Sequence, residues 1–157
     1  MRTLYVKNSV IANRGSGIFH EEAYDCIIRG NYVAHNGVHG VFISSSSDVE
    51  THGNHITANR LAGVQLFVDG ATGYDLANDL AHDNVFRMRG GTYNGLSAAG
   101  GADATVYSTL KNNRFQGNTY SVPNASDRFS YWNGNWKTWS QWRASGQDTV
   151  GKLLILP

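Results

Sequence analysis

The chain has 157 residues, which is long enough for one folded domain with a core but short for two. Charged residues make up 16% of it and the formal net charge is +1, so its totals do not favour nucleic acid as a partner. No apolar stretch approaches the length of a membrane span, so a membrane is not an expected partner either. Gly is abundant at 18 residues and Pro is scarce at two, a balance that favours many tight turns over a disordered linker.

Three stretches of the chain repeat at one constant offset: Asn8–Ile18, Asn31–Val41 and Asn54–Val64. In each stretch an Asn is followed two places later by a branched aliphatic residue, and then by a second Asn, a Gly and another aliphatic residue. A period in the twenties that combines short β-branched runs with Asn and Gly turns is typical of a solenoid. Each unit of a solenoid buries its apolar face by stacking on its neighbour.

One repeat unit contains three short strands. In Asp48–Gly53 polar and apolar residues alternate with period two, as in a strand, and Asn54 ends this alternation. A second short strand is expected at His55–Ala58 and a third at Gly63–Leu66, with a turn at Asn59–Ala62 between them. Three strands joined by turns close into a triangular coil, and coils stacked about 4.8 Å apart form three parallel sheets. The sequence therefore predicts an all-β fold, a right-handed parallel β-helix.

The repeated positions also predict what lies at the corners and in the interior of the coils. The Asn at 8, 31 and 54 is expected at a tight corner, where its amide can bond to the equivalent amides of the coils above and below. The expected inward stacks are Val10 with Val33 and Ile56, Ile18 with Val41 and Val64, Cys26 with Val49, and Ile28 with Thr51. The only cysteine, Cys26, is thus expected in the core and not as a nucleophile.

A single domain is expected over residues 1–157, with coils over 1–120 and a capping segment over 121–157. The chain begins within a repeat, because Thr3–Lys7 aligns with Cys26–Gly30, and no N-terminal cap is expected.

The regular spacing fails after Val68. The next Asn-x-Phe unit begins at Asn84, later than the offset between Asn31 and Asn54 predicts, and a further unit is expected at Asn113–Asn118. Enlarged turns are therefore expected near 69–83 and 90–105, the places where a solenoid usually carries its function.

Four tryptophans lie within eleven residues near the C-terminus: Trp132, Trp136, Trp139 and Trp142. Thr138 and Gln141 fit a capping box, so a short helix is expected from about residue 139 to about 145. The aromatic residues either cover the last coil or offer a platform on which sugar rings stack. We favour the cap, because the run from Leu153 to Pro157 is also apolar.

The pattern Asn-x-[Val/Ile]-x-x-Asn followed by Gly-[Val/Ile] resembles the pectate-lyase-like superfamily, which includes polysaccharide lyases, C5-epimerases and secreted bacterial relatives. The resemblance covers residues 3–68 well and 84–120 loosely, and the ending from Asn118 to Asp148 is similar to the C-terminal segment of many bacterial members. It implies a carbohydrate-active β-helix, secreted or at the cell surface, with a polysaccharide as its partner. Where the epimerases carry Asp-Pro-His-Asp, this chain has His20, Glu21 and Glu22.

Lyases and epimerases of uronic-acid polymers need a cation for the carboxylate, a base for the C5 proton and an acid. The strand that begins at Gly17, Gly40 and Gly63 offers these groups at its two ends, which we expect within about 5 to 15 Å of one another. The expected catalytic residues are His39, His20, Arg60, Glu21 and Glu22. The expected substrate-binding residues are Arg14, Gln65, Asp69 and Phe42.

Each of these residues has an alternative interpretation. His20 is either a structural core histidine or a general base, and His39 either a catalytic or binding group or a solvated loop residue. Glu21 and Glu22 are either ordinary turn residues or acid, base or calcium ligands. No cofactor is expected apart from a possible role for Ca²⁺, and no other metal site is predicted.

Two further sets of polar residues lie elsewhere in the repeat. His82 and Asp83 form a second candidate site, and Arg29 and His52 are expected to be solvated neighbours across two strands.

Two functions remain open. The first is a polysaccharide lyase or epimerase that acts on a uronic-acid-containing polymer. The second is a non-catalytic glycan-binding or structural β-helix module, either a fragment or a homo-oligomer that associates through its exposed coil ends.

Overall fold

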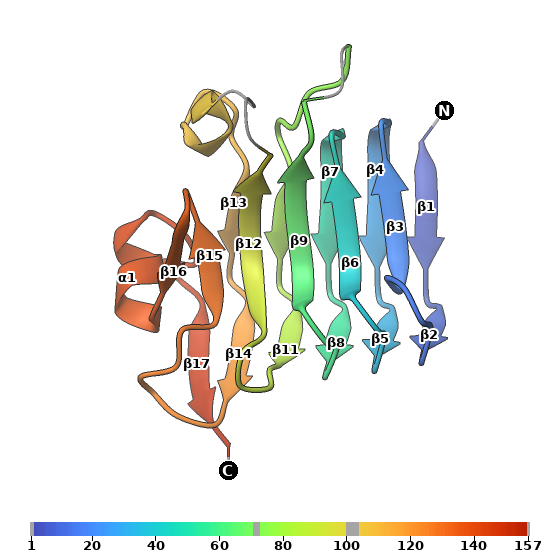
Figure 1. Ribbon diagram of the computed structural model, residues 1–157. Coiled ribbons are helices and arrows are strands. Elements are labelled where there is room, and N and C mark those ends of the chain that lie inside the picture. The colour runs from blue at the N-terminus through green and yellow to red at the C-terminus, as the bar shows by residue number, and fades with distance from the viewer. Residues whose placement is uncertain (1, 71–72, 100–103, 157) are drawn as a thin grey trace.

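The structure is a computed structural model that describes residues 2–70, 73–99 and 104–156. Within these residues the chain winds through three sheets, A, B and C, in turn, and from β1 to β15 each pass adds one parallel strand to each sheet (Figure 1). The predicted all-β parallel β-helix is confirmed. The core is the interior of the tube that the three sheets enclose.

Sheet A begins each coil. Its strands are, in spatial order, β1 (Thr3–Val6), β4 (Tyr24–Arg29), β7 (Ser47–His52), β10 (Leu80–His82) and β13 (Arg114–Gln116).

Sheet B follows sheet A across a tight corner. Its strands are β2 (Ser9–Ile11), β5 (Tyr32–Ala34), β8 (His55–Thr57), β11 (Val85–Arg87), β14 (Thr119–Val122) and β17 (Lys152–Ile155). The apolar C-terminal run thus joins the protein's own sheet as β17, which pairs in parallel with β14.

Sheet C closes each coil. Its strands are β3 (Ile18–Glu21), β6 (His39–Ser44), β9 (Ala62–Val68), β12 (Tyr93–Ala98), β15 (Ser130–Trp132) and β16 (Asn135–Lys137). The last pair, β15 and β16, is antiparallel and is joined by Asn133 and Gly134, both with positive φ. Such an Asn-Gly pair suits a two-residue hairpin.

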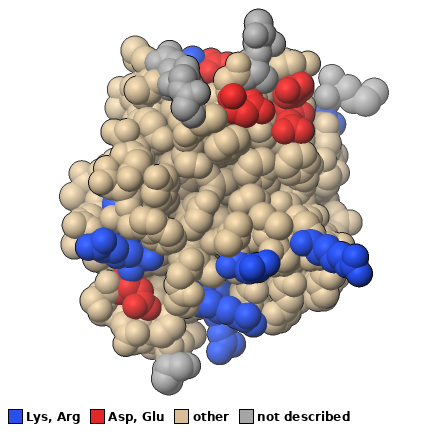
Figure 2. Space-filling model, in the orientation of Figure 1, with Lys and Arg blue, Asp and Glu red and all other residues tan. Residues whose placement is uncertain are grey.

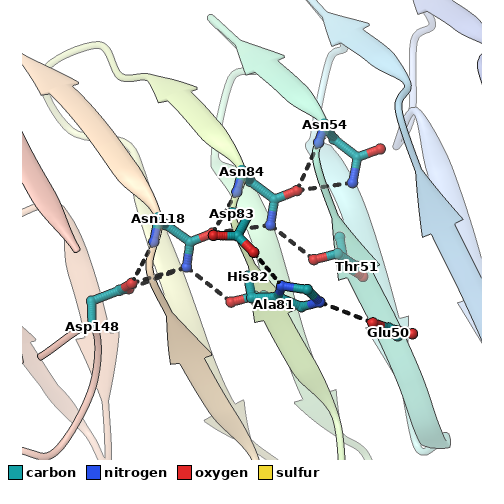
Figure 3. A network of polar contacts seen from close by, with 9 residues as sticks. All are labelled: Glu50, Thr51, Asn54, Ala81, His82, Asp83, Asn84, Asn118 and Asp148. Carbon is teal, nitrogen blue, oxygen red and sulfur yellow. Dashed lines mark hydrogen bonds and ion pairs between the residues drawn. The ribbon is translucent and has the colours of Figure 1, made fainter. Parts of the chain in front are cut away.

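An asparagine ladder follows the corner between sheets A and B, as predicted. The side-chain Oδ1 of Asn31 accepts the backbone N–H of Asn8 at 2.8 Å, and Asn54 does the same for Asn31 at 2.9 Å. The column continues through Asn84 and Asn118 and ends at Asp148 (Figure 3). The corner is therefore held by side-chain amides that satisfy buried backbone donors.

The prediction that Asn113 begins the next unit of the ladder is wrong by five residues. Asn118 continues the ladder instead, 34 residues after Asn84, and Tyr120 pairs with Phe86. Asn113 belongs to a different column, where its Oδ1 accepts the backbone N–H of Asp79 at 3.1 Å. Both Asn-x-aromatic stretches fit the pattern, so only the hydrogen bonds distinguish them.

The predicted interior stacks are confirmed. Val33 pairs with Ile56, Val41 with Val64, Cys26 with Val49 and Ile28 with Thr51, and all eight side chains are buried. The thiol of Cys26 is a core group, and burial raises its pKa to about 12. Burial of these aliphatic stacks is the main force that holds the coils together.

The two excursions lie on the C-to-A corner. The first runs from 69 to 79, between β9 and β10, within the range expected, although residues 71–72 lie outside the described residues. The second begins later than expected, because 93–98 forms strand β12 and the excursion runs from 99 to 113. It contains a 3-10 helix at Ala104–Tyr107, and residues 100–103 are outside the description.

The C-terminal segment covers the last coil with aromatic side chains. The predicted helix is α1 (Trp139–Ala144), and Gln141 Oε1 accepts the backbone N–H of Thr138 at 3.0 Å. Trp142 is fully buried against Phe115 and Trp132, and Trp139 packs on Tyr120. No helix among the described residues is long and apolar enough to cross a membrane.

Candidate functional site

The outer face of sheet C carries a ladder of aromatic rings. Phe19 and Phe42 pair across β3 and β6, and their rings stack with centroids 5.2 Å apart and planes 2° from parallel. Phe67 continues the group from β9, with its ring centroid 5.7 Å from that of Phe42. Phe19 is 50% exposed, so this apolar surface faces solvent and not the core. We call Phe19, Phe42, Phe67 and His39 the stacking platform.

His39 begins β6 and lies against the platform. Its ring stacks on Phe42 at 4.5 Å, and its Nδ1 shares a hydrogen bond with the Ser16 hydroxyl at 3.0 Å. Burial lowers the pKa of His39 to about 4, so the imidazole is neutral at pH 7. The side chain is therefore ordered by two neighbours, and it is uncharged.

Gln65 is the next residue in the same outward row, paired with Phe42 on one side and Gly95 on the other. It is 1% exposed although it faces outward. Its Nε2 donates to the Leu66 carbonyl and to the Ser97 hydroxyl, at 3.0 and 2.6 Å. Within the described residues, its buried Oε1 has no hydrogen-bond partner. An unpaired buried acceptor is costly, which makes this amide a place where a donor would be stabilising.

A second aromatic group lies farther along the same face. Tyr93, Tyr131 and Trp136 contact one another with ring centroids 5.1 to 5.9 Å apart. Trp136 comes from β16 and is 38% exposed. The four tryptophans therefore divide: Trp132, Trp139 and Trp142 pack into the cap, and Trp136 joins the outer face of sheet C.

Charged residues lie at the two ends of the sheet C strands and not together. Figure 2 shows a largely uncharged central surface, with most acidic side chains toward the upper edge, most basic side chains across the lower part and one acidic group beside basic ones at the lower left. Arg60 precedes β9 and Asp69 follows it, so seven residues of extended strand, about 23 Å, separate them. Glu21 and Glu22 end β3, whereas Arg14 precedes it. The expected cation and carboxylates are therefore farther apart than the sequence predicts.

His20 lies inside the tube. It pairs with Ile43, is 5% exposed and presents its ring to the edge of Tyr5 at 6.1 Å. Burial lowers the pKa of His20, which keeps the imidazole neutral. The strand alternation that turns Phe19 outward turns His20 inward, so it does not reach the face where His39 lies. The core-histidine interpretation is the one that the structure supports.

Asp69 and Glu22 are held in turns by local hydrogen bonds. Asp69 accepts a 2.5 Å hydrogen bond from the Ser45 hydroxyl, which ties the start of the first excursion to the β6–β7 turn. Glu22 has a positive φ of 47° and donates its N–H to the Ser44 carbonyl, as a turn residue does.

The second candidate, His82 with Asp83, lies on the outer face of sheet A. His82 stacks on His52 at 5.0 Å, and its two ring nitrogens contact Glu50 at 2.9 Å and Asp83 at 2.7 Å (Figure 3). The hydrogen bond from His82 is the main cause of a lowered Glu50 pKa. Arg29 and His52 pair across β4 and β7, as predicted. Both nitrogens of His82 are engaged, so this group is a closed hydrogen-bonded cluster and not an open site.

No group of three or more His, Cys, Asp or Glu side chains in the described part of the chain has a geometry that could hold a metal ion.

The sequence predicted Phe42, His39 and Gln65 as site residues but not Phe19, Phe67, Tyr93, Tyr131 and Trp136. Phe19 could have been found, because it aligns with Phe42 at the same offset that relates Asn8 to Asn31. Phe67 could not, since it pairs with Ser44 and stacks diagonally. The second group depends on the bulge before Gly95 and on the β15–β16 hairpin.

The family model described as "Right handed beta helix region" matches residues 2–81, just over half of the chain. The protein therefore belongs to the right-handed β-helix family. A search of curated proteins matched none, and a search of solved structures also matched none.

Proposed function

We propose that the outer face of sheet C binds a polysaccharide by ring stacking. The observation that carries the proposal is the parallel stack of Phe19 and Phe42 outside the core, flanked by His39 and Phe67. Apolar rings gathered on a solvent-facing sheet mark an interaction surface, and the C–H face of a sugar ring packs well on an aromatic plane.

The neighbouring polar groups support the same proposal. Gln65 lies beside Phe42 with an Oε1 that is unpaired in the described structure, and the Ser97 hydroxyl contacts its Nε2. Ligand sites combine mostly apolar walls with a few placed polar groups, which is the composition of this face. The central surface is largely uncharged, whereas most basic and acidic groups lie toward its margins (Figure 2).

A lyase or epimerase reaction on the same face, of the kind found in the pectate-lyase-like superfamily, is a second proposal. One observation favours it: His39 lies against the platform with a neutral imidazole, the form that can accept a proton. Its pKa of about 4 makes it a weak base, however, and this counts against catalysis. The separation of Arg60 from Asp69 speaks for binding without catalysis. A polymer of this kind is found outside cells, so the proposal includes a secreted or cell-surface location.

The test of binding is affinity electrophoresis in gels that contain pectate, alginate, a glycosaminoglycan or a neutral glucan. Phe19→Ala should weaken binding of the recognised polymer about tenfold, the effect of losing one stacking contact, because Phe19 is the most exposed ring of the platform. Tyr24→Ala is the matched control, because Tyr24 is an equally exposed aromatic residue on sheet A. Unchanged mobility shifts in Phe19→Ala, or an equal loss in Tyr24→Ala, would contradict the proposal.

The test of catalysis follows the ultraviolet absorbance of unsaturated uronate product, with NMR detection of epimerised residues. His39→Gln should abolish turnover, whereas it should weaken polymer binding less than Phe19→Ala does, because Phe19 is the more exposed ring of the platform. Binding without turnover in the unmodified protein would leave only the binding function.

A further inference from the structure

A cleft of about 570 Å³ opens on the outer side of sheet B, where its strands turn toward sheet C. It lies within the size range of small-ligand sites, about 300–1,000 Å³. Successive coils contribute to it, with lining residues that include Tyr32, His35, Arg87, Arg89, Ser121 and Leu156. Polysaccharide binding on the stacking platform does not use this cleft.

Two arginines give the cleft its charge. Phe86 points into the core and is fully buried, so strand alternation turns Arg87 outward from β11. Arg89 follows in the turn before β12, where the Thr92 hydroxyl accepts the Arg89 N–H at 3.1 Å and donates to its carbonyl at 2.7 Å. Both arginines are exposed, and the backbone that carries Arg89 is held in place.

Neither guanidinium is neutralised within the part of the chain that the structure describes. Arg2 and Lys111 form ion pairs with Asp25 and Asp75, but no ion pair involves Arg87 or Arg89. No acidic side chain among the described residues lines the cleft. A concave surface with two unpaired guanidinium groups concentrates positive potential and suits a carboxylate, which each planar fork can bind through two hydrogen bonds.

Part of the lining is apolar and suited to a ring, beside the polar His35, Thr57 and Ser121. Met88 and Val122 are buried in the wall, and Tyr32 and Leu156 are 44% and 42% exposed at the cleft. A simple inorganic anion would use the guanidinium groups and leave this surface in water. A sugar acid would use both parts.

We propose that this cleft is a second, independent site that binds a uronic acid residue, with its carboxylate on Arg87 and Arg89. Its sugar ring packs over Met88 and beside Tyr32.

The experiment is a titration of the ¹⁵N-labelled full chain with glucuronate, glucose and inorganic phosphate, followed by amide NMR shifts. Glucuronate should shift the amides of Ala58, Gly90 and Ser121, which line the cleft, and its affinity should fall as NaCl is added. Glucose and phosphate should each bind at least about tenfold more weakly than glucuronate. Glucose lacks the carboxylate for the two arginines, and phosphate lacks the sugar ring for the apolar wall.

The variants are Arg87→Gln and Arg89→Gln, each expected to weaken glucuronate binding about tenfold. Arg87→Lys keeps the positive charge but lacks the planar guanidinium that makes two hydrogen bonds to a carboxylate. Its affinity for glucuronate should therefore lie between those of the parent and Arg87→Gln. Arg29→Gln is the matched control, an exposed arginine on sheet A, and should bind as the parent does. An unchanged amide spectrum of each variant without ligand checks that its fold is intact.

Three results would overturn the inference: phosphate binding as tightly as glucuronate, glucose binding equally well, or unchanged affinity in both Gln variants. Phe19→Ala should leave glucuronate binding intact. An unmodified protein that binds glucuronate in the cleft but no polymer on the platform would refute only the proposed function, and one that binds polymer but no glucuronate would refute only this inference.

Discussion

Two carboxylic acids occupy ladder positions that are otherwise built from asparagine, and their surroundings differ. Asp148 ends the main ladder, where its Oδ1 accepts the Asn118 N–H and its Oδ2 accepts Tyr120 and Trp142 donors. Asp79 accepts the Val49 N–H through Oδ1, but its buried Oδ2 has no partner in the described structure. Burial raises the pKa of both groups, and that of Asp79 rises well above its usual value.

Asp79→Asn should stabilise the protein at neutral pH, by roughly 1–2 kcal/mol. The folded state of the parent holds a proton on Asp79 that the unfolded state loses near its ordinary pKa. Stability of the parent is therefore fully present below that value and falls as pH rises toward the raised folded-state pKa. Urea unfolding from about pH 4 to about pH 8 should show this decline in the parent and not in the variant.

Asp148→Asn is the contrasting substitution. An amide at this position cannot accept at both ends, so its NH₂ group would face the Trp142 indole N–H, which lies 3.1 Å from Oδ2. The variant should lose roughly 1–3 kcal/mol. A stabilised Asp148→Asn variant, or a destabilised Asp79→Asn variant, would show that the partners of the two carboxylates are assigned wrongly.

At the scale of the element, the asparagine ladder connects coils that differ in length. Successive ladder residues are 23, 23, 30, 34 and 30 positions apart in the sequence. In every step the backbone N–H and the side-chain Nδ2 of one Asn both donate to the Oδ1 of the next Asn or Asp. The excursions therefore lengthen the C-to-A corner without changing the A-to-B corner. Sheets A and B keep their register because the insertions lie outside them, whereas the pairing of β12 with β9 in sheet C shifts at the bulge before Gly95.

Asn84→Ala should destabilise the protein by roughly 3 kcal/mol or more, because it leaves the buried Asn54 N–H without its acceptor. Asn84 also donates to the Thr51 carbonyl and to Asn118, and these bonds are lost as well. Asn8→Ala is the matched control: Asn8 is exposed and its side chain donates to Asn31, so the loss should be under about 1 kcal/mol. Urea unfolding of both variants measures the difference, and equal losses would contradict it.

At the scale of the whole molecule, the protein is a stack in which each coil contacts only its neighbours. In the described structure β1, β2 and β3 are paired on one side only, whereas β9 is paired on both. The first coil carries exposed apolar side chains, including Leu4 at 59% and Ile11 at 48%. An open strand edge of this kind is a template for pairing with another chain.

Amide hydrogen exchange should be faster in β1–β3 than in β9 when the protein is dilute. If a second copy of the chain covers the first coil, protection of β1–β3 should rise with protein concentration while that of β9 stays constant. Sedimentation over the same concentrations provides the independent measure of association. Protection of β1–β3 that does not depend on concentration would exclude the homo-oligomer.

The sequence alone determined the coil. A constant period with fixed Asn, Gly and aliphatic positions indicates identical coils that stack on one another and share a buried interior. It also determined the inward stacks and the C-terminal helix, whose signals are local. It did not determine the pairing of strands after Val68, where the constant period ends. The pattern therefore placed Asn113 in the ladder, at the position that Asn118 occupies.

Only the tertiary structure decided which side chains meet on the surface. Outward neighbours come from different coils, so Phe67 stacks diagonally on Phe42, and Arg87 and Arg89 share a cleft with Leu156. Strand length also separated Arg60 from Asp69, which the sequence predicted to lie together. The interior repeats because every coil must fill the same tube, whereas no packing requirement makes the outer residues repeat, and these are the residues available for function.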